Sequence, residues 1–299
     1  MTDLIKEPFV CVADVKATLG EGPIFDPRDG LFYWLDIKGG EIHRLNIQSN
    51  ERETFQAPAV ISSLALAQSG GFICAHKEGF GRLAFDNGGP TFTPFGDPES
   101  DLPDNRFNDG KADPAGGYWA GTMDDKERGL RSGSWWRLAP DGAMSRLVDG
   151  FHICNGPTFD VDRGRVYLTD SLTQKVFVAE TDGTSLGPLT EFLSFAAEDG
   201  HPDGMEVDAE GCLWIAFWDG AAVQRFSPDG APLERIPVPA KRPTSLNFVD
   251  DAIYVTSAAV GASERALEKW PQSGGLFKAV LSRSLATPVQ YVDDASLPR

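Results

Sequence analysis

Cysteine is scarce in this chain, since its 299 residues include four cysteines and no Cys-x-x-Cys pair. Cysteines scattered in this way argue against a disulfide framework and against a zinc site built from thiolates. Cys74 and Cys212 lie inside apolar runs, where a free thiol behaves as a small hydrophobic group. We therefore expect buried, unpaired thiols.

Basic residues are also few. Lys and Arg total 27 against 44 Asp and Glu, which gives a formal net charge of -17. Nucleic acids and anionic membranes both attract basic surfaces. The sequence therefore predicts neither nucleic acid nor membrane as a partner.

Long hydrophobic runs are missing as well. No stretch approaches the roughly 20 apolar residues of a membrane span. The first ten residues, MTDLIKEPFV, hold no apolar run long enough for a signal peptide. We expect a soluble, cytoplasmic protein. Its composition, 41% hydrophobic and 10% aromatic, is sufficient for a packed core.

Helical periodicity is nearly absent, and the best helix candidate is the short stretch ASERALEKW at 262–270. Instead, a loose unit recurs: a small residue, a short apolar strand, a turn with Asp or Gly, and a second apolar strand. Repeats of this length indicate an array of similar structural units. The six copies begin 40 to 48 residues apart, at Gly22, Ser63, Gly110, Gly156, Gly204 and Thr244.

Further strand signals follow the second strand of several units, at 42–47, 134–139, 175–180 and 222–227. Four short antiparallel strands repeated six times predict an all-β, six-bladed β-propeller, as a single domain over 1–299. We expect the N-terminal stretch 9–17 to pair with the last blade near 274–280 and so close the ring. The alternative is a pair of β-sandwiches, which lack such even spacing.

Polar residues cluster directly before the predicted inner strands. In a propeller, the loops that enter the inner strands meet at one end of the central channel, so equivalent positions converge. Carboxylate and amide oxygens are the ligands that hard divalent cations prefer. Each residue taken alone also fits an ordinary turn. The positions are Glu21, Ser62, Asn108 with Asp109, Asn155, Asp203 and Pro243.

Four segments, LGEGPIFD, NRFNDGKADPAGGYWAGTM, NGPTFD and HPDGMEVDAEGCLWIAFW, resemble the signature segments of the SMP-30/gluconolactonase family, also called regucalcin-like. The resemblance runs from about residue 13 to about residue 280. It is strongest to bacterial sugar-acid lactonases such as xylonolactonases and arabinonolactonases. The family implies a six-bladed propeller with one catalytic divalent metal.

The resemblance also implies roles for single residues. Arg106 and Asn108 match positions that contact substrate or lie close to the metal. The stretch 124–133 matches weakly in a region that forms a lid over the substrate, so the choice of substrate stays open. The three implied metal ligands are Glu21, Asn155 and Asp203.

The expected reaction is the opening of a sugar lactone by water, giving an aldonic acid, in a monomer or weak homo-oligomer. Asp203 is the first candidate for the catalytic base as well as a ligand, and Glu21 and Asp109 compete with it. The metal is left open among Ca²⁺, Zn²⁺, Mn²⁺, Mg²⁺ and Fe²⁺. Alternatives are a calcium-binding regulatory protein, an organophosphate or aryl-ester hydrolase on the same fold, and a propeller that only binds other proteins. No Gly-x-Ser-x-Gly motif occurs, so an acyl-serine route is not expected.

Overall fold

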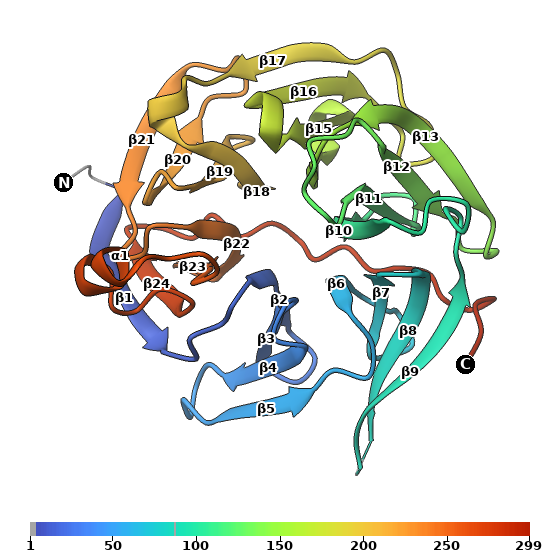
Figure 1. Cartoon of the computed structure of the whole chain (residues 1–299), viewed down its shortest axis with the longest axis horizontal. Coiled ribbons are helices and arrows are strands. Elements are labelled where there is room, and N and C mark those ends of the chain that lie inside the picture. Colours follow the sequence, from blue (N-terminus) through green and yellow to red (C-terminus); the bar gives the residue numbers. More distant parts are fainter. Residues whose placement is uncertain (1–3, 87) are drawn as a thin grey trace. The chain divides into compact units, whose positions relative to one another are not determined.

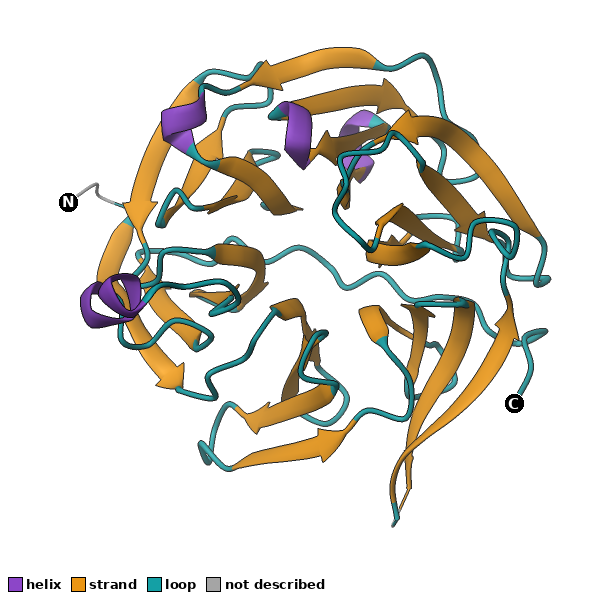
Figure 2. Ribbon diagram, in the orientation of Figure 1, coloured by secondary structure: helices purple, strands orange, loops and turns teal. Residues whose placement is uncertain are grey.

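A computed structural model of the chain describes residues 4–86 and 88–299, and residues 1–3 and 87 lie outside this description. Strands dominate, and helix is confined to short segments (Figure 2). These are α1 (Glu264–Lys269) and the 3₁₀ turns η1 (Val161–Arg163), η2 (Ser171–Thr173) and η3 (Ala197–Asp199). The short helix predicted within 262–270 is confirmed. In the described ranges, no helix is long and apolar enough to cross a membrane.

The strands form six four-stranded antiparallel sheets, so the predicted six-bladed β-propeller is confirmed. Five sheets take four consecutive strands in chain order, and the sixth combines the last three strands with the first. The chain divides into two compact units of three blades, which are described separately. The first holds residues up to Thr54 with Phe195–Pro288, and the second holds Phe55–Ser194 with Val289–Arg299. A single domain over 1–299, which includes positions outside the described residues, stays a prediction.

In the first unit, β1 (Ile5–Ala13) pairs antiparallel with β24 (Leu276–Leu281), and the two run side by side in Figure 1. This confirms the predicted closure of the last blade, although the strand begins and ends four residues before the predicted range 9–17. The other strands are β2 (Gly20–Asp26), β3 (Leu31–Asp36), β4 (Glu41–Asn46), β5 (Arg52–Gln56, across the unit boundary), β18 (His201–Val207), β19 (Leu213–Trp218), β20 (Ala222–Phe226), β21 (Pro232–Pro237), β22 (Pro243–Val249) and β23 (Ala252–Ser257).

The second unit repeats the same meander three times, each blade running outward from its first strand. Its strands are β6 (Ile61–Leu66), β7 (Phe72–His76), β8 (Gly79–Asp86), β9 (Gly89–Gly96), β10 (Asn105–Ala112), β11 (Tyr118–Asp124), β12 (Gly133–Leu138), β13 (Met144–Phe151), β14 (Cys154–Asp160), β15 (Arg165–Asp170), β16 (Lys175–Glu180) and β17 (Thr190–Ser194).

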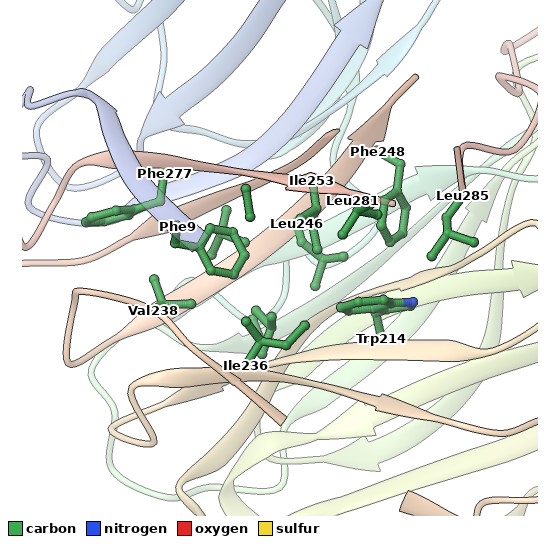
Figure 3. Packing of buried hydrophobic residues seen from close by; sticks show 14 of the residues in the cluster. Phe9, Trp214, Ile236, Val238, Leu246, Phe248, Ile253, Phe277, Leu281 and Leu285 are labelled. Atoms are coloured by element: carbon green, nitrogen blue, oxygen red, sulfur yellow. The ribbon is translucent and has the colours of Figure 1, made fainter. Parts of the chain in front are cut away.

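Large aromatic side chains fill the space between neighbouring blades. In the first unit, Trp214 of β19 packs edge-on against Phe248 of β22, with ring centroids 5.5 Å apart (Figure 3). In the second, Trp119 of β11 meets Phe159 of β14 at 5.3 Å. Edge-to-face pairs of this kind add to the stability that burial alone provides. These aromatics are therefore part of the core that packs neighbouring blades together.

The four cysteines are free, and Cys74, Cys154 and Cys212 are buried, as expected of thiols in apolar runs. Burial raises the pKa of the Cys154 thiol well above its ordinary value. These thiols therefore act as small core residues.

Buried aspartates hold the turns that join the first and second strands of several blades. Asp113 accepts hydrogen bonds from the backbone N–H groups of Ala115 and Gly117. Its other oxygen accepts from Arg137 Nε at 2.7 Å. Asp208 holds the equivalent turn in the first unit and accepts from Trp214 Nε1 and Arg225 Nε. The repeated Asp therefore ties each turn to the neighbouring strands.

We predict that Asp113→Ala lowers the free energy of unfolding by about 3–5 kcal/mol, the usual effect of leaving one partner of a buried ion pair alone. The Arg137 side chain is 8% exposed and would lose its carboxylate. The shift of the urea midpoint measures the effect. The matched control is Asp141→Ala, at an exposed turn aspartate that accepts from the Ala143 N–H, with an expected change within about 0.5 kcal/mol. Equal shifts for both variants would contradict the prediction.

Candidate functional site

The first strand of each blade carries a β-bulge near its start. The bulges lie at or next to the polar positions that the sequence analysis identified. A bulge adds one residue to a strand and re-aims the side chains around it. The shifts in pairing fall between Glu21 and Ile24, Ile61 and Ser63, Phe107 and Asp109, Asn155 and Thr158, Pro202 and Met205, and Pro243 and Leu246.

The sequence pattern predicts that these polar residues lie on loops that precede the inner strands, and this prediction is wrong. Glu21, Asn155 and Asp203 lie inside β2, β14 and β18. Likewise Arg106 and Asn108 belong to β10. The extra residue of the bulge interrupts the strand alternation, so the sequence pattern resembles a strand that begins one to five residues later.

In the second unit, the predicted residues Arg106, Asn108 and Asn155 are joined by hydrogen bonds. Arg106 is 5% exposed and donates from Nη1 to Asn108 Oδ1 at 2.8 Å and to the Phe107 carbonyl at 2.9 Å. Asn108 Nδ2 donates to Asn155 Oδ1 at 2.9 Å and to the Cys154 carbonyl. The structure therefore brings together three site residues that lie up to 49 positions apart in the chain.

Both ends of this chain of hydrogen bonds rest on residues that the sequence did not single out. Asp125 accepts from Arg106 Nε at 3.0 Å, and its other oxygen lies 3.1 Å from Lys77 Nζ. Ser171 Oγ accepts from Asn155 Nδ2 at 2.8 Å. Ser171 fixes the orientation of the Asn155 amide directly, and Asp125 fixes that of the Asn108 amide through Arg106. No local motif marks Asp125 or Ser171, because each lies on a different strand or loop from its partner.

Asp109, which competed as a candidate base, is committed to backbone contacts. Its Oδ1 accepts from the Gly110 N–H at 2.7 Å and its Oδ2 from the Gly156 N–H at 3.0 Å. Gly156 has a φ of +85°, a conformation that side chains disfavour. Asp109 therefore fastens β10 to the bulge of β14, next to Asn155.

In the first unit, Glu21 and Asp203 are 7% and 5% exposed, and β22 packs beside both of their strands. The glycine after Asp203 has a packing role, because a Cβ on Gly204 would lie 2.3 Å from Ser245 Oγ of β22. Close approach of β18 and β22 thus requires glycine at this position. His201 lies opposite Trp218 at the end of the β18–β19 pair.

The donor set fits a hard divalent cation. Glu21 and Asp203 offer buried carboxylates. Asn155 offers an amide oxygen whose orientation is fixed, because its Nδ2 is held by Ser171. Oxygen donors of this type suit Ca²⁺, Mg²⁺ and Mn²⁺. Within residues 4–86 and 88–299, no group of three or more His, Cys, Asp or Glu side chains is arranged to hold a metal. The set implied by the resemblance includes the amide of Asn155, which is not one of these four residue types.

The weakly matching stretch 124–133 is held by ion pairs. Arg128 pairs with Asp124 at 2.6 Å and with Asp104 at 3.1 Å. Lys126 also pairs with Asp104, at 2.6 Å. The Arg128 guanidinium lowers the pKa of Asp124 to about 2. The segment is thus fastened to the residue that precedes β10, the strand that carries Arg106. Its action as a lid stays a prediction.

A cavity of about 410 Å³ opens beside Arg106 in the second unit. This volume lies within the range of roughly 300–1,000 Å³ for small-molecule sites. Eight of its eleven lining residues are polar or charged, and Leu102, Pro103 and Phe107 add apolar surface. The lining residues are Lys77, Glu78, Asp97, Glu99, Ser100, Leu102, Pro103, Asn105, Arg106, Phe107 and Thr122.

Comparison with known proteins identifies a matching family model, related sequences and a similar solved structure. A family model described as "SMP-30/Gluconolactonase/LRE-like region" matches residues 19–259. The chain is 33% identical to an L-arabinolactonase of Azospirillum brasilense over 90% of each chain. It is 32% identical to a 6-deoxy-6-sulfogluconolactonase of Pseudomonas putida, over 91% of this chain and 94% of the relative. A crystal structure of a calcium-binding protein, regucalcin, from Agrobacterium tumefaciens superposes with a TM-score of 0.88 at 30% identity, covering 96% of this chain and 98% of the other.

Proposed function

Because the chain belongs to the SMP-30/gluconolactonase/LRE-like family, we propose that it hydrolyses a sugar lactone to the aldonic acid with the help of one divalent cation. Two similar proteins are named as sugar lactonases, which supports this substrate class. We further propose that the six blades work as one domain, as a monomer or weak homo-oligomer in the cytoplasm.

The observation that carries the proposal is the hydrogen-bonded series Asp125–Arg106–Asn108–Asn155–Ser171. It couples a buried guanidinium to the amide that is the proposed metal ligand. A positive fork and a fixed amide oxygen are suited to the carbonyl and hydroxyl oxygens of a lactone. The cavity beside Arg106 offers several charged and polar side chains as hydrogen-bond partners, which suits a polyol substrate.

Glu21, Asn155 and Asp203 would hold the cation. When bound, a divalent cation polarises the lactone carbonyl and stabilises the negative charge that develops on its oxygen. The equivalent place of the three residues, each at the bulge of an inner strand, supports this assignment.

The protein's own groups then have separate tasks. Arg106 donates to the lactone oxygens, and Asn108 orients a substrate hydroxyl. The Asp203 carboxylate accepts the proton of the attacking water as its oxygen bonds to the carbonyl carbon. The bond from that carbon to the ring oxygen then breaks, and the ring oxygen takes up the proton held by Asp203 and leaves as a hydroxyl. The product is the open aldonic acid, which ionises to the aldonate.

A calcium-binding regulatory role is the second candidate, because the similar solved structure is described as a calcium-binding protein. Hydrolysis of an organophosphate or aryl ester at the same site is the third. The two kinds of hydrolase use the same cation and differ in the groups that contact the substrate.

Removing the metal tests the proposal. We expect chelator treatment to abolish acid release from a panel of aldonolactones, and one divalent metal, added back alone, to restore it well above spontaneous opening. Glu21→Gln should prevent this restoration, because it removes one ligand charge. Metal binding without lactone opening, measured by calorimetry, would favour the calcium-binding role. Turnover that is unchanged in chelator would contradict metal dependence.

A further inference from the structure

The cavity beside Arg106 extends away from the hydrogen-bonded series Asp125–Arg106–Asn108–Asn155–Ser171 and shares one residue, Arg106, with it. It is bounded by the turn after β7 and by the segment that precedes β10. Arg106 belongs to both, since it lines the cavity and donates to Asn108. A substrate that contacts Arg106 would therefore bring its remaining atoms next to this cavity.

One wall of the cavity is held together by hydrogen bonds to the buried side chain of Glu99. Glu99 is buried, and its carboxylate accepts from Asn105 Nδ2 at 2.8 Å, Thr122 Oγ1 at 3.0 Å and Trp136 Nε1 at 2.8 Å. Asn105 Oδ1 in turn accepts from Ser132 Oγ at 2.7 Å. This hydrogen-bonded part of the lining is polar, whereas Leu102, Pro103 and Phe107 supply apolar surface elsewhere in the cavity.

The charge of the lining is unfavourable for an anion. Glu78, Asp97 and Glu99 carry negative charge, whereas the lining contains two cations, Lys77 and Arg106. Both cations already pair with Asp125, at 3.1 and 3.0 Å. Neutral hydroxyl groups, which both donate and accept hydrogen bonds, suit this lining better than a carboxylate or sulfonate does.

We propose that this cavity binds the exocyclic, hydroxyl-bearing carbons of the lactone, so that the protein prefers a longer neutral polyol tail to a short or anionic one. The inference rests on the proposed function and adds a specificity subsite to it. Ser100 and Glu78 contribute the hydroxyl and carboxylate acceptors at the rim.

Three lactones with the same ring configuration test the preference. L-Arabinono-1,4-lactone carries a one-carbon tail, D-galactono-1,4-lactone a two-carbon diol, and the matching galactaro-1,4-lactone a carboxylate at the same place. We expect kcat/KM to be about 2- to 12-fold higher for the diol than for the one-carbon tail, the range set by one neutral hydrogen bond. The carboxylate should be the poorest of the three.

Two pairs of variants assign the preference to this cavity. Ser100→Trp narrows it and should lower the ratio of galactono- to arabinono-lactone, whereas Asp101→Trp, on the exposed neighbour outside the lining, should not. Glu78→Lys should raise kcat/KM for the galactaro-lactone by about 10-fold, equivalent to about 1.4 kcal/mol. Asp101→Lys makes the same change of charge and should have little effect.

The outcomes are distinguishable. If the wild type opens all three lactones without preferring the diol, or if each cavity variant changes all three rates equally, the subsite is refuted while the lactonase stands. If the wild type opens none of them faster than buffer, the proposed function fails and the subsite fails with it.

Discussion

Asp203→Asn will lower kcat for lactone opening by about 10³-fold or more, within the range of roughly 10²–10⁴ attributed to a general base. Asparagine has nearly the same shape but loses the charge and the proton acceptor. Asp203 is 5% exposed at the bulge of β18, so water cannot replace the carboxylate easily. Acid release at constant pH measures kcat, and metal content and melting temperature are recorded on the same sample.

The matched control lies in the same unit. Asp229 occurs in another Pro-Asp-Gly sequence, at 228–230, where it is exposed in a turn. Asp229→Asn should keep wild-type activity. If the Asp203→Asn protein retains its metal but loses turnover, Asp203 acts as the base. If it loses the metal, Asp203 acts as a metal ligand. A folded variant with wild-type kcat would refute both roles.

Arg106→Lys will lower kcat/KM by about 10²–10³-fold, comparable to the loss of one donor that stabilises developing negative charge. Lysine keeps the charge but lacks the planar fork. In the structure, that fork binds Asp125 through Nε and Asn108 through Nη1 at the same time. Its loss removes the donor that fixes Asn108 and hence weakens the hold on Asn155 Oδ1.

Separate values of kcat and KM show whether Arg106 contacts the substrate mainly in the transition state or equally in the ground state. A fall in kcat with constant KM indicates a contact made in the transition state, and a rise in KM alone indicates uniform binding. Arg146→Lys is the control, because Arg146 is exposed and pairs only loosely with Asp149, at 3.6 Å. If Arg106→Lys stayed within about threefold of the wild type, Arg106 would be a structural residue rather than a substrate contact.

Much of the fold followed from local patterns. The turn aspartates and glycines recur at even spacing, and each flanks a short apolar strand whose register needs few long-range contacts. The predicted third strands at 42–47, 134–139, 175–180 and 222–227 correspond to β4, β12, β16 and β20, with bounds that differ by one residue or not at all. A turn signal locates the end of a strand because only certain residues adopt its dihedral angles.

The bulges were the main local feature that the sequence pattern concealed. A bulge places two residues opposite one on the neighbouring strand, so it is defined by pairing and has no strong signature within a single strand. For this reason Asn155 was placed on a loop, whereas it lies in β14 opposite Thr169 of β15.

By itself, the sequence determined the number of blades, the closure by the N-terminal strand, the buried thiols and the family to which the chain belongs, because each of these depends on residues close together in the chain or on their spacing. Only the tertiary structure decided how the candidate site is held. Asp125 supports Arg106 from 19 residues away, and Ser171 supports Asn155 from 16 residues away. The cavity also takes its lining from separate strands and turns. Hydrogen bonds between strands and loops depend on how the blades pack, and packing distances cannot be inferred from the spacing of residues along the chain.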